Sequence, residues 1–500
     1  MSLEVEEKAP LPGDPLHPEP RHEPLVFERS GEGKVGYSLP PLDVPEATAI
    51  PREFLRQEIT GETEVTEVEV ARHFTRLSRL NFSIDQELYP LGSCTMKHNP
   101  RINEEMARLP GFAAAHPLAP EEVSQGTLEL AWRLEKALIE LTGLARVTLQ
   151  PSAGAQGELA GILMVRAALA KEGNPRRIVL IPDSAHGTNP ASAHFAGYTV
   201  RELKSNTRGT LDLDVLEEAM TEEVAALMLT VPNTLGIFED RILDIAEIVH
   251  GKGGYLYCDG ANFNSFVGIA KPGLMGIDVM HMNLHKTFST PHGGGGPGSG
   301  PVAVCEKVVP FLPRPIIERR PDGQYFLDFQ RPDSIGRLRT SLGNYGMFVR
   351  ALAYIASYGN RIGEVAQGAV LNANYIRAGL ADLYHLKYDA PTLHEVVFSD
   401  KKQAPHGVHN TDIGKRLMDY GFHPPTISFP LIVHGALMIE PTETEGRAGL
   451  DAFIYAMREI AREAREDPQI LTSAPHTTPV RRVDEVAAAR NLVLRWKPGS

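Results

Sequence analysis

The chain has 500 residues, 42% of them hydrophobic, and a formal net charge of −13. This length allows two or three domains around a large core, and the acidic balance without any basic block argues against a nucleic-acid partner. No apolar run reaches the roughly 18 residues of a membrane span, and the N-terminus lacks the basic and apolar regions of a signal peptide. We therefore expect a soluble, cytoplasmic protein without a membrane partner. Three cysteines are too few and too scattered for a disulfide framework or a zinc site, so no metal is expected.

The first part of the chain is rich in proline. Residues 9–51 hold many of the 39 prolines and cannot form long helices. We interpret residues 1–70 as an extended arm that covers the surface of this chain or of a partner. A merely disordered tail is the alternative.

From about residue 120 the hydrophobic pattern becomes periodic. Glu121 to Thr142 has apolar residues at helical spacing and stops before Gly143, which suits a helix C-terminus. The strands expected next are 146–150, 177–182, 225–231, 254–258, 279–284 and 302–305, and the helices are 156–171, 214–221 and 240–250. Almost continuous hydrophobicity predicts a mostly parallel sheet covered on both faces. The last strand is expected to be antiparallel, because too few residues precede it for a helical crossover.

A second, smaller α/β region is expected after a polar stretch that ends near Asp333. A long helical pattern runs from Asn344 into the 370s, and shorter patterns follow it. These predict strands at 394–399 and 437–440 and helices at 411–420 and 447–465. The predicted division is therefore a large domain at 71–343, including a helical segment that precedes it, and a small C-terminal domain at 344–500.

Two residues at strand ends carry the most chemical information. Lys286 follows the apolar run 276–284, and Asp259 follows the run 254–258. A buried lysine can bind the aldehyde of pyridoxal phosphate (PLP), and an aspartate can pair with the pyridine nitrogen and keep the ring an electron sink. A lone lysine after an apolar run is more often a solvated strand end. The aspartate, the histidines and the glycines around this one favour the cofactor.

Other polar or small residues follow the neighbouring strands, and ligands of open α/β sheets gather at the carboxyl ends of strands. Ser152, Ala153, Gly154 and Ala155 precede a helix N-terminus that suits a phosphate. The remaining candidates are His186, as a ring that stacks on the pyridine, Asn233, toward the 3′ oxygen, Ala261, beside the aspartate, and His285. Taken singly, His186 could be an ordinary core or surface histidine, Asn233 a turn residue, and the tract 293–296 a flexible loop.

Three longer motifs resemble a known family. The runs 89–97 (YPLGSCTMK), 283–298 (from NLHKTF to the glycine cluster) and 437–443 (LMIEPTE) are similar to the P-protein of the glycine cleavage system. The resemblance covers nearly the whole chain. It implies an aminotransferase-like PLP enzyme of fold type I that decarboxylates glycine and passes the aminomethyl group to the lipoyl group of H-protein, releasing carbon dioxide.

The resemblance also implies roles for particular residues. Lys286 would bind the cofactor, Asp259 would pair with its ring nitrogen, and His186 would stack on the ring. Ser152 to Ala155 with His285 would hold the phosphate, and Thr340 would reach it as well. Ser93, Cys94 and Thr95 would border the substrate, unless they form only a tight turn.

The chain matches only the C-terminal, cofactor-bearing half of the long single-chain form. The resemblance therefore implies subunit 2 of the two-subunit kind, with subunit 1 as a partner in an α2β2 assembly. Two alternatives stay open. One is another PLP lyase of fold type I, such as a cysteine desulfurase-like enzyme, although no cysteine follows Cys305 to serve as a loop nucleophile. The other is a non-catalytic half that completes a partner's site.

Overall fold

The computed structural model describes residues 23–38, 40–41, 43–45, 50–57, 62–116, 119–292 and 298–495. The chain divides into two compact units, one made of residues 1–86 with 473–500 and the other of residues 87–472. Of the expected arm at 1–70, residues 1–22, 39, 42, 46–49 and 58–61 lie outside the described residues. Among the helices of the described part of the chain, none is both long and apolar enough to cross a membrane.

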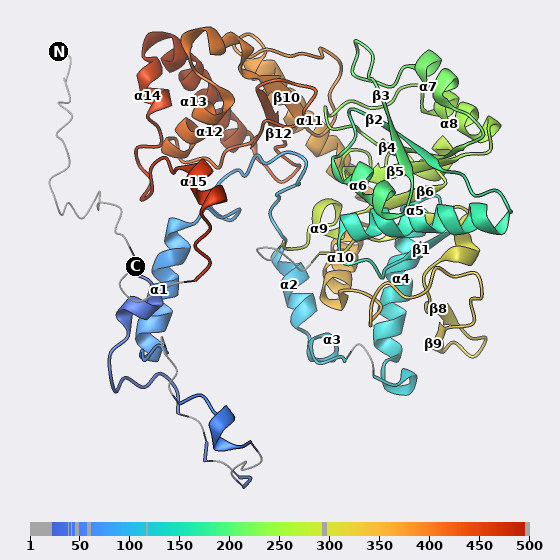
Figure 1. Ribbon diagram of the computed structural model, residues 1–500, viewed down its shortest axis with the longest axis horizontal. Helices are drawn as coiled ribbons and strands as arrows, with labels where there is room; N and C mark the ends of the chain where they lie inside the picture. The colour runs from blue at the N-terminus through green and yellow to red at the C-terminus, as the bar shows by residue number, and fades with distance from the viewer. Residues whose placement is uncertain are drawn as a thin grey trace. The chain divides into compact units, whose positions relative to one another are not determined.

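A seven-stranded sheet forms the centre of the unit 87–472, in the order β1-β7-β6-β5-β4-β2-β3 (Figure 1). Its strands are β1 (Arg146–Thr148), β2 (Ile178–Pro182), β3 (Thr199–Leu203), β4 (Val224–Thr230), β5 (Tyr255–Gly260), β6 (Val279–Met282) and β7 (Val302–Val304). Five of them, from β3 to β6 in spatial order, run parallel, whereas β7 is antiparallel to both β6 and β1. Every residue of β4 is buried, as expected for a strand covered on both faces.

Successive side chains of the strands enter two separate cores, one on each face of the sheet. Leu227 and Leu256 belong to the core that α4 and α8 cover, and Met228 and Tyr257 belong to the core under α5 and α6. The helices of this region are α2 (Arg101–Arg108), α3 (Pro110–Ala113), α4 (Gln125–Thr142), α5 (Gly154–Lys171), α6 (Thr188–Phe195), α7 (Leu213–Ala219), α8 (Ile242–Gly251) and α9 (Leu284–Thr287). Figure 1 shows α5 lying across the strands of the sheet.

A second sheet has the order β10-β12-β11 and is antiparallel throughout. It packs with helices drawn in orange and red in Figure 1, and a β8–β9 hairpin precedes this region. The elements are β8 (Ile316–Arg319), β9 (Tyr325–Asp328), α10 (Tyr345–Tyr358), α11 (Gly363–Leu380), β10 (Val396–Ser399), α12 (Asn410–Asp419), β11 (Thr426–Ile427), β12 (Ala436–Ile439), α13 (Arg447–Glu466) and α14 (Pro468–Thr472). The expected boundary after residue 343 falls between β9 and α10 and remains a proposal.

The other unit contains α1 (Glu67–Leu80) and α15 (Glu485–Arg490) among its described residues. Glu23 lies against α1, where its carboxylate binds His73 and Arg76. Since Glu23 accepts from both side chains, the described part of the arm is fastened to α1 by charge-assisted hydrogen bonds.

The structure confirms the mostly parallel sheet and the antiparallel last strand. The long helix expected from Asn344 is divided into α10 and α11, because Gly359 has a φ of 54°, outside the helical range. The sequence analysis missed α6 and β3, which follow Asp183. The β8–β9 hairpin was also not predicted. It lies in the polar stretch before Asp333, for which no strands were expected.

Two glycines, one on α4 and one on α5, give a test of this packing. A Cβ on Gly161 of α5 would lie 2.6 Å from the buried Tyr257 ring and 3.0 Å from Val279, whereas one on Gly126 of α4 would meet nothing within 4 Å. We expect Gly161→Ala to lower the thermal unfolding midpoint, because about 1–3 kcal/mol of overpacking exceeds the ~1 kcal/mol that alanine adds to a helix. The control Gly126→Ala should raise the midpoint, and an increase for both variants would contradict the close packing of α5.

Candidate active site

Lys286 lies in the short helix α9, directly after strand β6. Its side chain is buried, with 7% of the residue exposed, and its Nζ donates a hydrogen bond of 2.6 Å to the main-chain oxygen of Ser93. The ammonium is therefore held between the sheet and the segment that contains Ser93. A lysine in this position is shielded from bulk water and has one local hydrogen-bond acceptor.

Asp259 lies near the end of β5, opposite His281 of β6 in the parallel register. Its Oδ1 accepts from the Ala261 N–H at 3.0 Å and lies 3.3 Å from His281 Nε2. Burial pushes the pKa of Asp259 up, but the His281 and His186 rings, the Ala261 N–H and Lys286 together hold that pKa below its usual value. Burial lowers the pKa of His281, whose Nδ1 pairs with the Tyr257 hydroxyl at 2.8 Å. An ionised aspartate beside a neutral histidine follows.

The second oxygen of this aspartate provides a test of whether PLP fits. Asp259 Oδ2 is buried and has no hydrogen-bond partner among the described residues. A protonated pyridine nitrogen is a donor of the kind that such an orphaned carboxylate oxygen requires. Further buried polar atoms without a partner in the described part of the chain lie on residues after β5, β6 and the glycine cluster, namely Asn262 Oδ1, Asn283 Oδ1, Thr287 Oγ1 and Ser299 Oγ. The residues present fit the cofactor.

His186 belongs to a chain of hydrogen bonds that also includes a buried glutamate. Its Nδ1 pairs with the Thr188 hydroxyl at 2.8 Å, and this hydroxyl donates to Glu158 Oε1 at 2.7 Å. Burial lowers the pKa of His186, and burial beside Asp259 raises the pKa of Glu158 to about 8. Both groups are therefore uncharged near neutral pH, and the negative charge of this region stays on Asp259.

The loop of Ser152 to Ala155 forms the N-terminus of the 18-residue helix α5. A Cβ on Gly154 would lie 2.7 Å from Asn283 Oδ1, so only glycine allows this close approach to the residue before α9. His285 Nδ1 accepts from the Ser299 N–H at 3.2 Å, and burial and Lys286 lower the pKa of His285 to about 3. A free helix N-terminus with a neutral imidazole nearby suits a phosphate group.

The segment Ser93–Thr95 lies against Lys286 from the other side. Gly92 contacts Met438 of β12 so closely that a Cβ would collide with that side chain, and Ser93 has a φ of 62°. A left-handed backbone is uncommon for serine and here turns its carbonyl toward Lys286. Cys94 Sγ is 3.9 Å from His292 Nδ1, and burial raises the pKa of this thiol.

Two predicted residues are placed differently from the others. Asn233 is buried, but its amide donates to Gly209 O and its carbonyl accepts from Leu235 N and Ile237 N, which favours the turn interpretation. Thr340 is exposed. Its segment lies beside the phosphate loop, since Gln156 Nε2 is 3.5 Å from Leu338 O. The glycine tract 293–296 lies outside the described residues.

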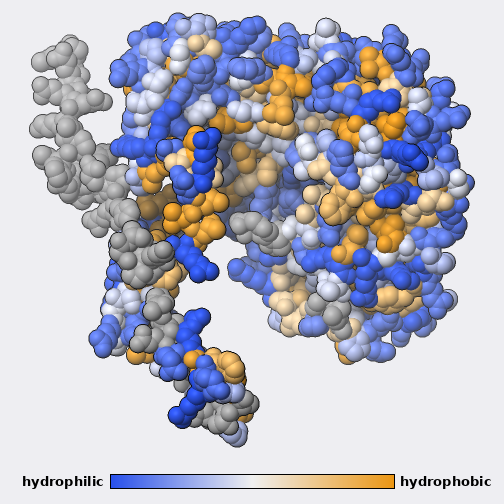
Figure 2. Space-filling view, viewed as in Figure 1, coloured by the Kyte–Doolittle hydropathy of each residue, from blue (hydrophilic) through white to orange (hydrophobic). Residues whose placement is uncertain are grey.

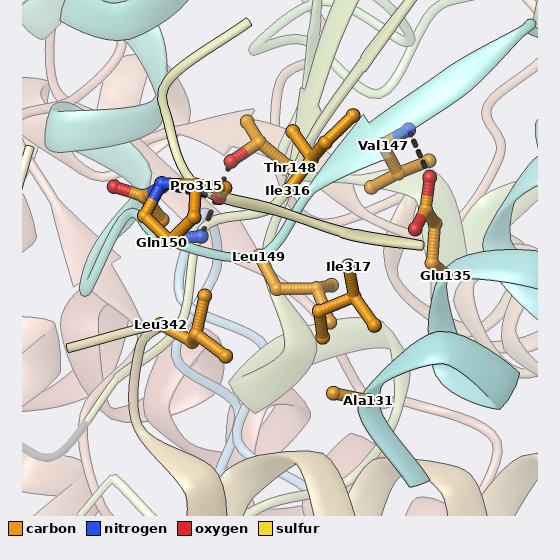
Figure 3. Close-up of a pocket in the computed structure, with 10 residues that line it drawn as sticks. All are labelled: Ala131, Glu135, Val147, Thr148, Leu149, Gln150, Pro315, Ile316, Ile317 and Leu342. Carbon is orange, nitrogen blue, oxygen red and sulfur yellow. Dashed lines mark hydrogen bonds between the residues drawn. The ribbon is translucent and has the colours of Figure 1, made fainter. Parts of the chain in front are cut away.

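A small cavity next to this loop is structural rather than a ligand site. It measures about 30 Å³ and lies between α4, β1 and the residues that begin β8 (Figure 3). This is room for about one water molecule. Gln150, at its edge, donates to Pro315 O at 3.1 Å and accepts from Leu338 N at 3.3 Å, so it fixes the chain just before Ser152.

Several buried groups of the site escaped the sequence analysis. Lys97 Nζ donates to Thr287 O at 2.8 Å and to Glu443 at 2.6 Å, so all three family-like motifs meet at this lysine, next to Lys286. Glu158 and His281 were missed because they lie inside a helix and a strand rather than at strand ends. Glu440 lies in the third motif. Its place directly after an apolar strand is the sequence feature that could have identified it.

Comparison with known families gives matches to most of the chain. The glycine cleavage system P-protein family matches residues 36–324, and the C-terminal domain of glycine dehydrogenase matches residues 365–476. A relative from Alkaliphilus oremlandii, named probable glycine dehydrogenase (decarboxylating) subunit 2, is 54% identical over 477 residues. The alignment covers 95% of this chain and 98% of that relative.

Solved structures confirm the predicted fold. The crystal structure of glycine decarboxylase (P-protein) of the glycine cleavage system, in inhibitor-bound form, matches with a TM-score of 0.70 and 23% identity, over 82% of this chain and 93% of that one. The cysteine desulfurase CsdA from Escherichia coli matches with a TM-score of 0.58 and 18% identity, over 76% and 95% of the two chains. The chain therefore has the fold of the type I PLP-dependent enzymes.

The position of Lys286 leads to a direct test. Borohydride reduction of the protein loaded with PLP should fix the cofactor to its lysine, and peptide mapping should find the label on Lys286, because this amine is buried beside Asp259. Lys97 is the matched control, since it is equally buried but paired with Glu443. A label on Lys97 or on another lysine would refute the assignment.

Proposed function

This chain belongs to the P-protein family of the glycine cleavage system, and we propose that it is the cofactor-bearing subunit 2 of a two-subunit glycine dehydrogenase (decarboxylating). The observation that carries the proposal is the unpaired Asp259 oxygen in the same buried site as Lys286. The identity of more than half to a relative of that name supports the reaction. The relative's name also supports a subunit 1 partner.

In this proposal each group of the site has one task toward PLP. Lys286 would bind it covalently, Asp259 would accept from its ring nitrogen, and His186 would cover the ring. The loop Ser152–Ala155 would hold its phosphate, with His285 and Thr340 nearby. When bound, PLP takes up the electron pair that is left when the bond between the glycine Cα and its carboxylate breaks.

The surroundings of each acidic side chain in this site determine whether that side chain is charged. Asp259 is held ionised by its neighbours, whereas Glu158 is kept neutral by burial. A single fixed negative charge near the ring nitrogen stabilises the transition state in which the ring gains electrons, because a buried charge acts in a low dielectric. The segment Ser93–Thr95 would border the glycine and keep water away from it.

The fate of the aminomethyl group depends on other proteins. We propose that it passes to the lipoyl group of H-protein while carbon dioxide leaves, and that subunit 1 completes an α2β2 assembly. The three cysteines are free thiols, which supports a reducing, cytoplasmic setting. The large domain at 71–343 would carry the cofactor. The region from 344 would contribute the residues that pack against Ser93.

The cysteine desulfurase alternative is less well supported. Such an enzyme needs a nucleophilic cysteine, and Cys94 is the one cysteine that lies beside Lys286. Burial raises the pKa of Cys94 and so keeps it as the less reactive thiol. A purely structural half would have no use for Lys286 and Asp259 in this arrangement.

Asp259→Asn tests the reaction itself. We expect the variant to retain PLP while its exchange of carbon dioxide with glycine falls by about 100-fold or more, since the carboxylate acts on the transition state. Bound PLP would be measured by absorbance, and Asp278→Asn, at another buried strand-end aspartate that binds His250, is the control. Normal exchange in a variant that still holds PLP would contradict the role of Asp259.

The partner proposal rests on the unit formed by residues 1–86 and 473–500. Figure 2 shows hydrophobic residues among the hydrophilic ones on its surface. Tyr37 and Phe54 of this unit are 78% and 77% exposed. Large aromatic side chains of this kind are typical of residues that dominate binding at interfaces. An arm rich in proline also gains order on binding at a moderate entropic cost.

We therefore expect the double variant Tyr37→Ser with Phe54→Ser to bind subunit 1 at least about tenfold more weakly, measured by titration calorimetry. Leu274→Ser changes a residue of the other unit that is 78% exposed, and it should leave the affinity unchanged. Full glycine decarboxylation by the isolated chain would show that no second subunit is required.

A further inference from the structure

Three fully buried titratable residues lie behind the segment Ser93–Thr95, and the described reaction gives them no task. His394 and Glu395 directly precede β10, and Glu440 directly follows β12. Because β10 and β12 are antiparallel with Val396 opposite Ile439, the register places Glu395 across from Glu440. One ligand-type atom from each of the three side chains lies within 4.8 Å of the others.

Both glutamates hold the Ser93–Thr95 segment directly. Glu395 Oε2 accepts from the Ser93 N–H at 3.0 Å, and Glu440 Oε1 accepts from the Thr95 hydroxyl and from Asn264 Nδ2 at 3.1 Å. The other two oxygens, Glu395 Oε1 and Glu440 Oε2, are buried and have no partner among the residues that the structure describes. One oxygen of each carboxyl group therefore accepts a hydrogen bond from the Ser93–Thr95 segment, and the other is buried without a partner among the described residues.

Two negative charges cannot both persist at this depth without a cation between them. Lys286, on α9, is the cation that acts on both glutamates, while Glu443, beyond β12, adds a further negative charge at Glu440. His394 contributes no positive charge, because burial lowers its pKa to about 3. Burial and the second carboxyl raise the pKa of Glu395 well above its usual value, and burial raises that of Glu440 to about 7.

We propose that Glu395 and Glu440 share one proton and that this pair, whose single negative charge is balanced by Lys286, holds Ser93–Thr95 against that lysine, which makes both glutamates positioning residues for the proposed reaction. The left-handed Ser93, with a φ of 62°, donates to the pair through its N–H and accepts from Lys286 through its oxygen. Loss of the shared proton would place two charges behind the segment and loosen this link. The pair would then set the alkaline limit within which the substrate wall keeps its shape.

Cys94 is a built-in reporter of that shape, because it lies between the two residues that the glutamates hold and is half-buried. We would measure its alkylation by iodoacetamide with peptide mapping, on the full chain, in the wild type and in Glu440→Gln. The rates should agree at about pH 6. At about pH 9 the loosened segment should make the wild type react roughly fivefold faster, although the Glu440 charge raises the pKa of the Cys94 thiol, because a neutral amide cannot acquire the second charge.

Glu445→Gln is the matched control, since burial raises the pKa of this glutamate to about 7 as well, while the charged group that acts on its carboxyl is Glu87. Its alkylation rate should equal that of the wild type at both pH values. Thr95→Val removes a contact of Glu440 without changing any acid and should speed alkylation at both pH values. A wild-type rate equal to that of Glu440→Gln across the pH range would overturn the proposal.

Thermal unfolding of the chain without PLP gives a second readout that does not depend on activity. The pKa of Glu440 is raised on folding, so the stability that its proton contributes is complete below about pH 4.5 and is lost as the pH rises through about 7. The difference in unfolding temperature between the wild type and Glu440→Gln should therefore decrease as the pH is raised from about 5 to about 8. A constant difference, or a stoichiometric divalent metal present in the wild type and absent from the variant, would exclude a shared proton.

Discussion

Parallel strands that end at one edge of a sheet are the constraint on which this site depends. The strands β4, β5 and β6 are adjacent and parallel. The residues that follow them therefore lie close together at the same edge of the sheet. Asp259 and His281 are opposite each other because of the register, and Lys286 follows four residues after β6. The antiparallel β7 then returns the chain so that Gly298 and Gly300 lie against the loop at Ser152 and Ala153.

A buried site with many titratable groups must limit its number of charges. Here the histidines are neutral by burial, and the glutamates Glu158 and Glu440 are kept near the protonated state by the same cause. Asp259 is the exception, because an N–H and two imidazole rings favour its charged form. Lys286 and Asp259 are then one positive and one negative group that would face a ligand in the proposed site.

The sequence predicted the features that depend on local pattern. Continuous hydrophobic runs identified the buried strands, and residues after those runs identified Lys286, Asp259 and His285. The pattern could not identify His281, which alternates with apolar neighbours inside β6, or Glu395, whose meaning depends on pairing with a strand more than forty residues away. Asn233 shows why a polar residue after a strand has two interpretations. The ligand contact stays a prediction, and the side chain hydrogen-bonds main-chain groups of Gly209 and of its own turn.

The pairing of β1 with β7 has a consequence for biosynthesis. Arg146 pairs with Val304, so the strand that leads into the phosphate loop emerges from the ribosome long before the strand that secures it. Gly300, which lies against Ala153, also arrives late. A nascent chain that ends before β7 therefore lacks the contacts that support the loop Ser152–Ala155, so this loop cannot reach its final packing until synthesis has passed Val304.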